Sequence, residues 1–472
     1  MSILNTVLVV IEALLALNLL IFVHELGHFW AARWRGLKVE RFAIWFGKPL
    51  WKKKIGGVEY ALGWIPAGGY VSLPQMATME AIEGKTENAA AQLPSAPPLD
   101  KIIVAFAGPL FSFLLAVVFA VLVWQVGKPA PQGDDKPVLG WVVPDGPAWK
   151  AGLRAGDLIT EIDGHPIQTY GPPSQDSILW RVITSEGTNI AIKYSRDGQE
   201  QMAHATPFKR ETKWYERRAM RQILVNSVFK PIVGSVMTNS PAERAGLQKG
   251  DEIVAINGEK IFSISAVEYA EDQMTNKDAK PVRFTLRRGS GEIERSVLAR
   301  SPSSPTNFPP IFGIAWQDNT NRTLAYPSPS DQIGAAAGQI FATIGAVISK
   351  RTEIGAQHLG GAVMIIRVYT NLFEDPQGWR LVLWFSVVLN VNLAMLNMLP
   401  LPVLDGGHIL LSLVEAVRRR AASPRILNYI QTGFAALLIT FMIWIAFYDI
   451  GDWIRGSRAA RHQQIIFAPK AN

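Results

Sequence analysis

The chain has 472 residues, enough for several domains, and charged residues make up only 18% of it. Because typical soluble domains carry about 25% charged residues, this deficit indicates that part of the chain lies in lipid. The sequence has no cysteine, which excludes disulfides, Cys-ligated zinc, iron–sulfur clusters and a thiol nucleophile. The formal net charge is +8, and basic residues gather over 33–54 beside an apolar stretch, which favours a membrane-flanking loop over a nucleic-acid surface.

Four long apolar stretches predict a polytopic α-helical membrane protein, since each stretch can cross about 30 Å of hydrocarbon. The predicted transmembrane ranges are 1–32, 102–126, 380–418 and 428–449. The first stretch has no basic residue before it and is longer than the apolar core of a secretory signal, so we interpret it as a retained helix. The third is interrupted by two prolines and an Asp-Gly-Gly run.

The basic residues beside these helices predict their orientation. The loop over 33–101 and the Arg418-Arg419-Arg420 run are positively charged, so both should face the cytoplasm. The N-terminus, the region over 127–379 and the tail over 450–472 should then lie outside, although arginines in the tail disagree mildly.

The segments between the helices differ in composition. Within the cytoplasmic loop, residues from about 55 to 73 are Gly-rich and alternate in polarity, which predicts a membrane-associated β-hairpin. Residues 74–100 are rich in Pro, Ala, Glu, Ser and Thr and predict a flexible linker. The stretch over 301–379 is predicted to be a second linker with a membrane-associated segment.

An internal repeat occupies the outer region. Residues 147–157 read Pro-Ala-Trp-Lys-Ala-Gly-Leu-Arg-Ala-Gly-Asp, and residues 241–251 match them at the Pro-Ala, Ala-Gly-Leu and Gly-Asp positions. This pattern, with a Gly-x-Val strand before it and an Asn-Gly turn after it, resembles bacterial PDZ domains, with Asp163 replacing Asn in the first copy. We therefore expect tandem mixed α/β PDZ domains over 130–210 and 220–300. Such domains bind peptides along a sheet edge, and the alternative is a pair of spacer domains without peptide.

The clearest chemical motif lies inside the first apolar stretch, where residues 24–28 read His-Glu-Leu-Gly-His. The histidines are spaced i and i+4, so on a helix both rings can reach one metal ion. Glu25 between them can act as general base toward water on that metal. Each charged group in a membrane span costs about 2.5–3.5 kcal/mol, so His24, Glu25 and His28 need each other or a metal. We interpret the motif as a metal site, and a polar helix-packing patch is the alternative.

A catalytic zinc usually has three protein ligands and one position open to water. Asp405 is the natural third ligand, because it is an acid within a predicted membrane span. The two glycines after it allow close approach of backbone, and the two prolines before it break the helix, as expected where unwound backbone lines a cavity. The alternative is a turn whose Asp caps a helix, in which case Glu12 or His408 becomes the next candidate.

The two motifs together resemble the site-2 protease family of intramembrane zinc metalloproteases. The first span carries the family's His-Glu-x-x-His, and residues 397–406 carry its Asn-x-x-Pro-x-x-x-Leu-Asp-Gly. Two PDZ copies between the second and third spans are similar to the bacterial RseP-like branch, the regulator of sigma-E proteases. The resemblance implies one zinc ion held by His24, His28 and Asp405, with Glu25 as the base and Asn397 holding or polarising the substrate.

The 57–71 segment resembles the family's membrane-reentrant hairpin, against which an extended substrate strand can pair. The substrate-binding residues expected there are Gly57, Val58, Tyr60, Gly68 and Gly69. Two other elements depart from the family pattern: Ser112 stands where the second span has Asn, and Leu359-Gly360-Gly361-Ala362 replaces Leu-Ser-Gly-Pro. These departures do not coincide with the proposed ligands, so we expect them to affect substrate positioning and not the zinc.

These features predict an enzyme that hydrolyses peptide bonds inside transmembrane segments. The expected partners are single-span membrane proteins and the bilayer, with peptide contacts at the PDZ domains and no nucleic acid. The family resemblance implies an anti-sigma factor or signal-peptide remnants as substrates. It also implies a bacterial inner membrane location, with the PDZ domains and both termini outside and the active site near the cytoplasmic face. A catalytically silent PDZ scaffold and a metal transporter are the competing functions, but neither needs Glu25 placed as a base.

Overall fold

The computed structural model divides into two compact units. It describes residues 3–76, 95–130, 136–171, 174–275, 280–305, 308–317, 323–349, 352–375, 377–419, 424–459 and 465–467. The first unit, here called the membrane unit, comprises residues 1–129, 325–341 and 359–450, and the remaining residues form the repeat unit. Residues 77–94 of the predicted linker and residues 460–464 and 468–472 of the tail lie outside the described residues.

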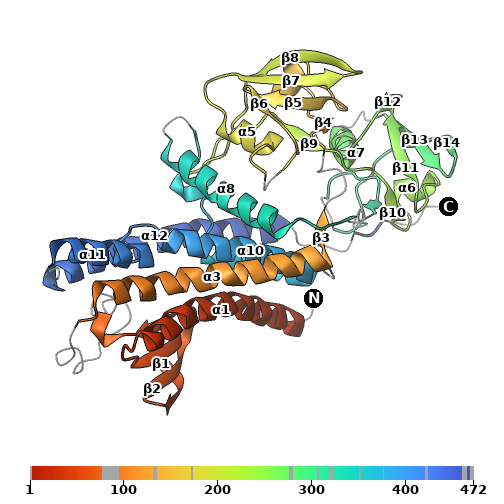
Figure 1. Cartoon of the computed structure of the whole chain (residues 1–472). Coiled ribbons are helices and arrows are strands. Elements are labelled where there is room, and N and C mark those ends of the chain that lie inside the picture. The colour runs from red at the N-terminus through yellow and green to blue at the C-terminus, as the bar shows by residue number, and fades with distance from the viewer. Residues whose placement is uncertain are drawn as a thin grey trace. The chain divides into compact units, whose positions relative to one another are not determined.

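The membrane unit is built from long apolar helices, shown in Figure 1. They are α1 (Ile3–Trp34), α3 (Pro98–Val126), α9 (Ala362–Glu374), α10 (Gly378–Asn397), α11 (Asp405–Arg418) and α12 (Pro424–Ala459). Within the described residues, five helices are long and apolar enough to cross a membrane. Four of them fall in the predicted stretches, and the fifth is α8 (Pro329–Ile348), which lies in a region predicted to be only membrane-associated. The protein is therefore an integral membrane protein.

The predicted third span is two helices, α10 and α11, separated by residues 398–404. Pro400 and Pro402 lie in this break, because proline has no N–H for a helical hydrogen bond and its ring clashes with the preceding turn. The break ends at Leu404, directly before Asp405. The interruption that the sequence predicted therefore places Asp405 in the first turn of a new helix.

Helix α3 is the centre of the membrane unit and packs against α1, α10 and α11. Two glycines allow α1 and α3 to approach closely. A Cβ added to Gly27 would meet the Ala107 carbonyl, and one added to Gly108 would meet the His28 ring. Small residues at helix contacts are typical of membrane proteins, where tight packing holds helices together.

A twisted sheet packs against α1, formed by β1 (Arg41–Ile55) and β2 (Val58–Ser72). Residues 41–44 pair with 59–62 on one side and with 69–72 on the other, and residues 51–55 also pair with 58–62. The two free edges of the sheet are therefore 51–55 and 69–72. The sheet begins at Arg41, well before the hairpin predicted from about residue 55. The first strand was not predicted because its lysines gave it the composition of a basic loop. Buried Phe42, Val58 and Val71 hold it on the helices.

The repeat unit contains two four-stranded antiparallel sheets with the same strand order, β6-β5-β7-β8 and β12-β11-β13-β14. The first copy consists of β4 (Leu139–Val142), α4 (Pro147–Lys150), β5 (Leu158–Ile162), β6 (His165–Pro166), α5 (Ile178–Thr184), β7 (Ile190–Arg196), β8 (Gln199–Ala205) and β9 (Val225–Ser227). The second consists of β10 (Val233–Val236), α6 (Pro241–Arg244), β11 (Glu252–Ile256), β12 (Glu259–Lys260), α7 (Ile264–Asp272), β13 (Val282–Arg288), β14 (Gly291–Val297) and β15 (Ile314–Trp316). Short strands β3 (Lys128–Ala130) and β16 (Thr323–Ala325) flank this region in the sequence. Each copy has its own hydrophobic core.

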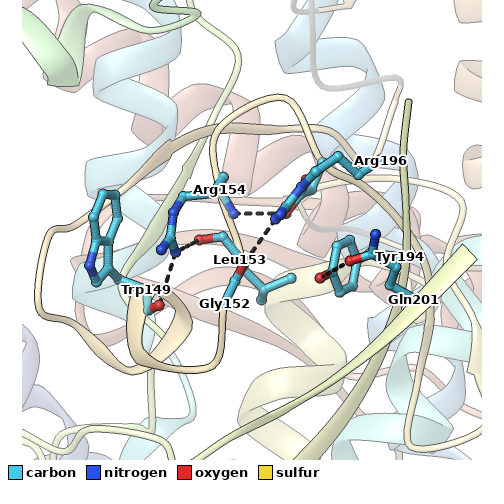
Figure 2. A network of polar contacts seen from close by, with 8 residues as sticks. Trp149, Gly152, Leu153, Arg154, Tyr194, Arg196 and Gln201 are labelled. Atoms are coloured by element: carbon cyan, nitrogen blue, oxygen red, sulfur yellow. Dashed lines mark hydrogen bonds and ion pairs between the residues drawn. The ribbon is translucent and has the colours of Figure 1, made fainter. Parts of the chain in front are cut away.

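The aspartate of the repeated Gly-Asp pair is held by an arginine in the same way in each copy. In the first copy, Arg196 donates two hydrogen bonds of 2.7 Å to the Asp157 carboxylate. It donates another of 2.8 Å to the Gly152 carbonyl, and Figure 2 shows Arg196 and Gly152. In the second copy, Arg288 makes the equivalent bonds to Asp251 and Gly246. The repeat in sequence is thus a repeat in structure, extended by an arginine pair outside the matched segments.

Candidate metal centre

Three residues from two helices converge in the membrane unit. The Nε2 atoms of His24 and His28 are 3.3 Å apart, and Asp405 places one carboxylate oxygen 3.3 Å from the first and the other 3.4 Å from the second. All three side chains are buried. They form the single group of three or more candidate metal ligands found among the described residues.

The distances between these nitrogen and oxygen atoms fit a zinc ion. Zinc binds histidine nitrogen and carboxylate oxygen at about 2.0–2.2 Å with tetrahedral geometry, which places neighbouring ligand atoms about 3.3–3.5 Å apart. The three distances fall in this range, and the two that involve Asp405 end on different carboxylate oxygens. The donor set, two imidazoles and one carboxylate with one position left over, is that of a catalytic zinc site.

Helix α3 orients both imidazole rings from behind. The Nδ1 of His28 lies 2.8 Å from the Val104 carbonyl oxygen, which can only accept, so His28 donates from Nδ1 and its Nε2 lone pair faces the cluster when the ring is neutral. The Nδ1 of His24 lies 3.0 Å from the Ser112 hydroxyl. Metal-binding histidines commonly donate their second N–H to such a partner, which fixes the tautomer and the ring orientation.

The Asp-Gly-Gly run explains how Asp405 reaches the cluster. A Cβ added to Gly406 would collide with the Met398 carbonyl, and one added to Gly407 with the Leu401 carbonyl. The start of α11 is therefore pressed against the broken segment that leads into it. Side chains other than hydrogen at these two positions would push Asp405 away from the histidines.

Glu25 and Asn397 lie next to the cluster of candidate ligands. The side-chain amide of Asn397 is 3.3 Å from the His24 Nε2, so it stands next to the position that the three ligands leave open. Glu25 lies against the edge strand, because a Cβ added to Gly69 would be 3.0 Å from the Glu25 side chain. The structure thus brings the base candidate, the ligand candidates and a free sheet edge together.

The five hairpin residues selected from the sequence do not share one location. Gly69 belongs to the free edge next to Glu25, and Gly68 precedes it with φ of 70°. Tyr60 pairs with both Phe42 and Lys53, so it lies on an inner strand that cannot accept another strand. Val58 is buried, and Gly57 lies in the turn before it. Gly57, Val58 and Tyr60 therefore do not form part of the edge beside Glu25.

Sequence reasoning missed two features of the site. The first is the contact of Ser112 with a proposed ligand, since its hydroxyl lies 3.0 Å from the His24 Nδ1. A buried ion pair of 2.8 Å also joins Lys101 of α3 to Glu415 of α11. Lys101 and Glu415 are far apart in sequence, and only the packing of α3 against α11 reveals their pairing.

The fold and the site define a membrane-embedded metallopeptidase. A family model described as peptidase family M50 matches residues 12–441, and the chain belongs to this family. The resemblance to the site-2 proteases is thereby confirmed.

Full-length relatives agree with this assignment. The chain is 30% identical over 463 residues to a Vibrio cholerae protein provisionally named a zinc metalloprotease, covering 93% of this chain and 97% of the relative. It is 27% identical to Protease RseP of Yersinia pestis and to the regulator of sigma-E protease RseP of Salmonella typhimurium, covering 92% of this chain and 97% of each relative. A solved PDZ domain of an SdrC-like protein from Listeria monocytogenes is 24% identical with a TM-score of 0.16, covering 20% of this chain and 88% of that one.

Proposed function

We propose that His24, His28 and Asp405 hold the single zinc ion of this intramembrane metalloprotease and that Glu25 is its general base. The observation that carries this proposal is the buried cluster itself, in which the two histidine Nε2 atoms lie 3.3 Å apart and face different Asp405 oxygens at 3.3 and 3.4 Å, between apolar helices. A scaffold or a transporter has no use for a glutamate placed beside both the ligands and a free sheet edge. Peptide hydrolysis therefore explains more of the site than either alternative.

The residues around the cluster divide the chemistry between them. Zinc, when bound, supplies a Lewis acid that lowers the pKa of a coordinated water to about 7. Glu25 accepts a proton from the attacking water and passes it to the leaving amine. Asn397 holds the scissile segment or polarises its carbonyl from the open side of the cluster, as its amide lies 3.3 Å from the His24 Nε2.

The free edge over 69–72 is the proposed substrate dock. A transmembrane helix hides its carbonyls in internal hydrogen bonds, so a substrate segment must unwind before hydrolysis. An extended segment pairing with 69–72 would satisfy its backbone groups and pass beside Glu25. We propose Gly68 and Gly69 as the substrate-binding residues of this edge, whereas Gly57, Val58 and Tyr60, which the sequence also predicts to bind substrate, lie outside it.

The proposed setting is a bacterial inner membrane with the cytoplasm on the side of the 33–54 basic segment. The repeat unit is proposed to be a tandem of PDZ domains on the outer side, supported by its duplicated sheets and duplicated Asp–Arg pairs. Four helices are proposed to cross the bilayer, with α8 associated with the membrane surface because its hydropathy of 1.2 is the weakest of the five. One relative is named a regulator of sigma-E protease, and we propose single-span membrane proteins, namely an anti-sigma factor or signal-peptide remnants, as substrates.

The decisive experiment replaces the base without disturbing the ligands. Glu25→Gln is nearly isosteric, so the fold and bound zinc should be retained while cleavage of a single-span substrate falls at least about 100-fold. Zinc content is measured by metal analysis and cleavage by gel shift in the same membrane preparation. Glu12→Gln is the matched control, because Glu12 also lies on α1 but outside the cluster, and it should cleave normally. Normal cleavage by Glu25→Gln would refute the assignment.

The outer repeats are proposed to filter substrates by size. Replacing residues 135–300 with a short flexible linker should preserve cleavage of a substrate with a short external stub. It should also allow cleavage of a full-length substrate that the intact enzyme refuses. If cleavage of the short substrate is lost while zinc stays bound, the repeats recruit substrate through their grooves instead.

A further inference from the structure

The two proposed histidine ligands contact α3 through different kinds of hydrogen-bond partner. His28 donates to a backbone carbonyl, that of Val104, which no substitution can remove. His24 contacts a side chain, the Ser112 hydroxyl, at 3.0 Å from Nδ1. Ser112 is fully buried and His24 is 7% exposed, so water has little access to either group.

We propose that Ser112 is a positioning residue that orients the His24 ring and accepts its Nδ1–H in the tautomer that binds zinc. This inference rests on the proposed function, in which the His24 Nε2 is a ligand atom. A neutral imidazole carries one N–H, and a ring that donates from Nδ1 to Ser112 presents a bare Nε2 lone pair to the cluster. The Ser112 hydroxyl therefore acts through His24 and does not touch the substrate.

The opposite arrangement shows why the acceptor matters. If the proton sat on Nε2, it would point at the Asp405 oxygen 3.3 Å away and form a hydrogen bond in place of a metal bond. Removing the acceptor at position 112 leaves a buried Nδ1–H unpaired, which costs about 1–3 kcal/mol and favours that second tautomer. Zinc would then have to displace a proton and a hydrogen bond before binding.

The proposal also explains the departure from the family pattern at this position. Asparagine and serine both offer an oxygen that can accept an N–H, so each can satisfy Nδ1. The element Gly108–Phe113 then has two functions at the same helix face. Gly108 leaves room for the His28 ring, and Ser112 fixes the His24 ring one turn further along α3.

The test compares two isosteric variants of the full chain in detergent. Threonine and valine have the same shape, but only threonine keeps the hydroxyl, so the comparison is Ser112→Thr against Ser112→Val. Zinc affinity is measured by competition with a chelator, all in the Glu25→Gln background so that no proteolysis interferes. We expect Ser112→Val to bind zinc about 10–100-fold more weakly than Ser112→Thr, the range observed for outer partners of metal ligands.

A matched control tests whether any buried hydroxyl would have this effect. Ser386 of α10 is also buried, and its hydroxyl is 2.9 Å from the Tyr369 hydroxyl. Ser386→Ala should lose a buried hydrogen bond and leave zinc affinity unchanged. Ser112→Ala, which cannot overpack the site, should weaken zinc binding as Ser112→Val does.

Failure of this inference is distinguishable from failure of the proposed function. Equal zinc affinity in Ser112→Val, Ser112→Ala and Ser112→Thr, with Asp405→Ala unable to bind zinc, would overturn the role of Ser112 and keep the ligand assignment. Full zinc occupancy in Asp405→Ala would overturn the ligand assignment itself. A loss in Ser386→Ala equal to that in Ser112→Ala would also overturn the inference, because the effect would then come from general packing.

Discussion

Buried carboxylates occur in both units of the molecule, but their neighbours are of opposite kinds. Asp157 and Asp251 in the repeat unit are each 1% exposed, and each faces the N–H groups of one arginine and of a backbone amide. Asp405 in the membrane unit is 8% exposed, and its two oxygens face the Nε2 atoms of two histidines. Burial alone therefore does not distinguish these three residues.

The difference lies in which groups supply the positive charge. In the repeats, the guanidinium of Arg196 or Arg288 satisfies the carboxylate and stabilises the domain. We call Arg196–Asp157 and Arg288–Asp251 the closed pairs, and His24, His28 and Asp405 the open cluster. In the membrane unit, the anchoring of His28 on Val104 leaves acceptor atoms facing one another, an arrangement that a cation completes. A buried acid with its donors in place indicates structure, and a buried acid among acceptors indicates a metal.

The largest expected effect comes from breaking the open cluster. Asp405→Ala should lose zinc and activity together, because two histidines fall short of the three protein ligands that a catalytic zinc usually has. Asn397→Ala is the matched control on the same loop region, and it should lower activity while zinc stays bound. Metal analysis of the purified chains checks both. Full occupancy in Asp405→Ala would mean that the third ligand lies elsewhere, with His408 of α11 as the next candidate.

The sequence was most informative where chemistry depends on local spacing. The i and i+4 histidines and the Leu-Asp-Gly motif predicted a cluster that the structure assembles from α1 and α11. The repeat was likewise visible, because its matching residues lie within two eleven-residue segments, 147–157 and 241–251. What could not be predicted depends on contacts across the fold. The Arg196 and Arg288 partners lie outside the matched segments, and the Ser112 contact requires α3 to pack against α1.

The strand over 41–55 shows a second limit. Its lysines and its glycine at Gly47 have the composition of a loop, and its pairing comes from residues up to Ser72. Strand preference depends on cross-strand neighbours more than on intrinsic tendency, so composition was a poor guide here. The consequence for the site was direct, since only the pairing shows that 69–72 is an edge and that Tyr60 is not.

A smaller effect is expected from opening the closed pairs. Arg288→Met leaves the Asp251 carboxylate buried without its main donor, which should destabilise the second repeat by about 1–3 kcal/mol. Burial by itself would raise the pKa of Asp251, but the Arg288 hydrogen bonds and the Gln248 amide hold it below the usual value. The stabilisation is therefore present at neutral pH and lost as the pH falls through that lowered pKa. Arg196→Met should likewise lower the stability of the first repeat.

The control for these variants is an exposed ion pair on the same strand. Arg283 and Glu294 are 3.8 Å apart, with side chains 59% and 61% exposed, so Arg283→Met should change stability by less than about 0.5 kcal/mol. Hydrogen exchange of the β13 amides in the full chain reports the local stability. Zinc content should be unchanged in all three variants. A loss of zinc in Arg288→Met would mean that the closed pairs are coupled to the metal centre.

The last expected effect depends on pH and concerns a carboxylate intermediate between the two kinds. Glu271 of α7 accepts a 2.6 Å hydrogen bond from the Phe312 amide, and burial raises its pKa to about 7, with Glu268 and Asp272 adding to the rise. Because the folded pKa is above the unfolded value of 4.5, the folded state loses stability as the pH rises from 4.5 to 7 and levels off above that. Glu271→Gln keeps the acceptor oxygen and removes the charge. It should match the parent near pH 4.5 and exceed it at pH 8 by at most about 3.5 kcal/mol, from about 1.4 kcal/mol per pKa unit. Hydrogen exchange of β11 and β13 at both pH values measures the difference, with the exposed Glu294→Gln as control. An equal gain in stability at pH 4.5 and pH 8 would show that Glu271 is already ionised at the lower pH in the folded protein, as Asp251 is.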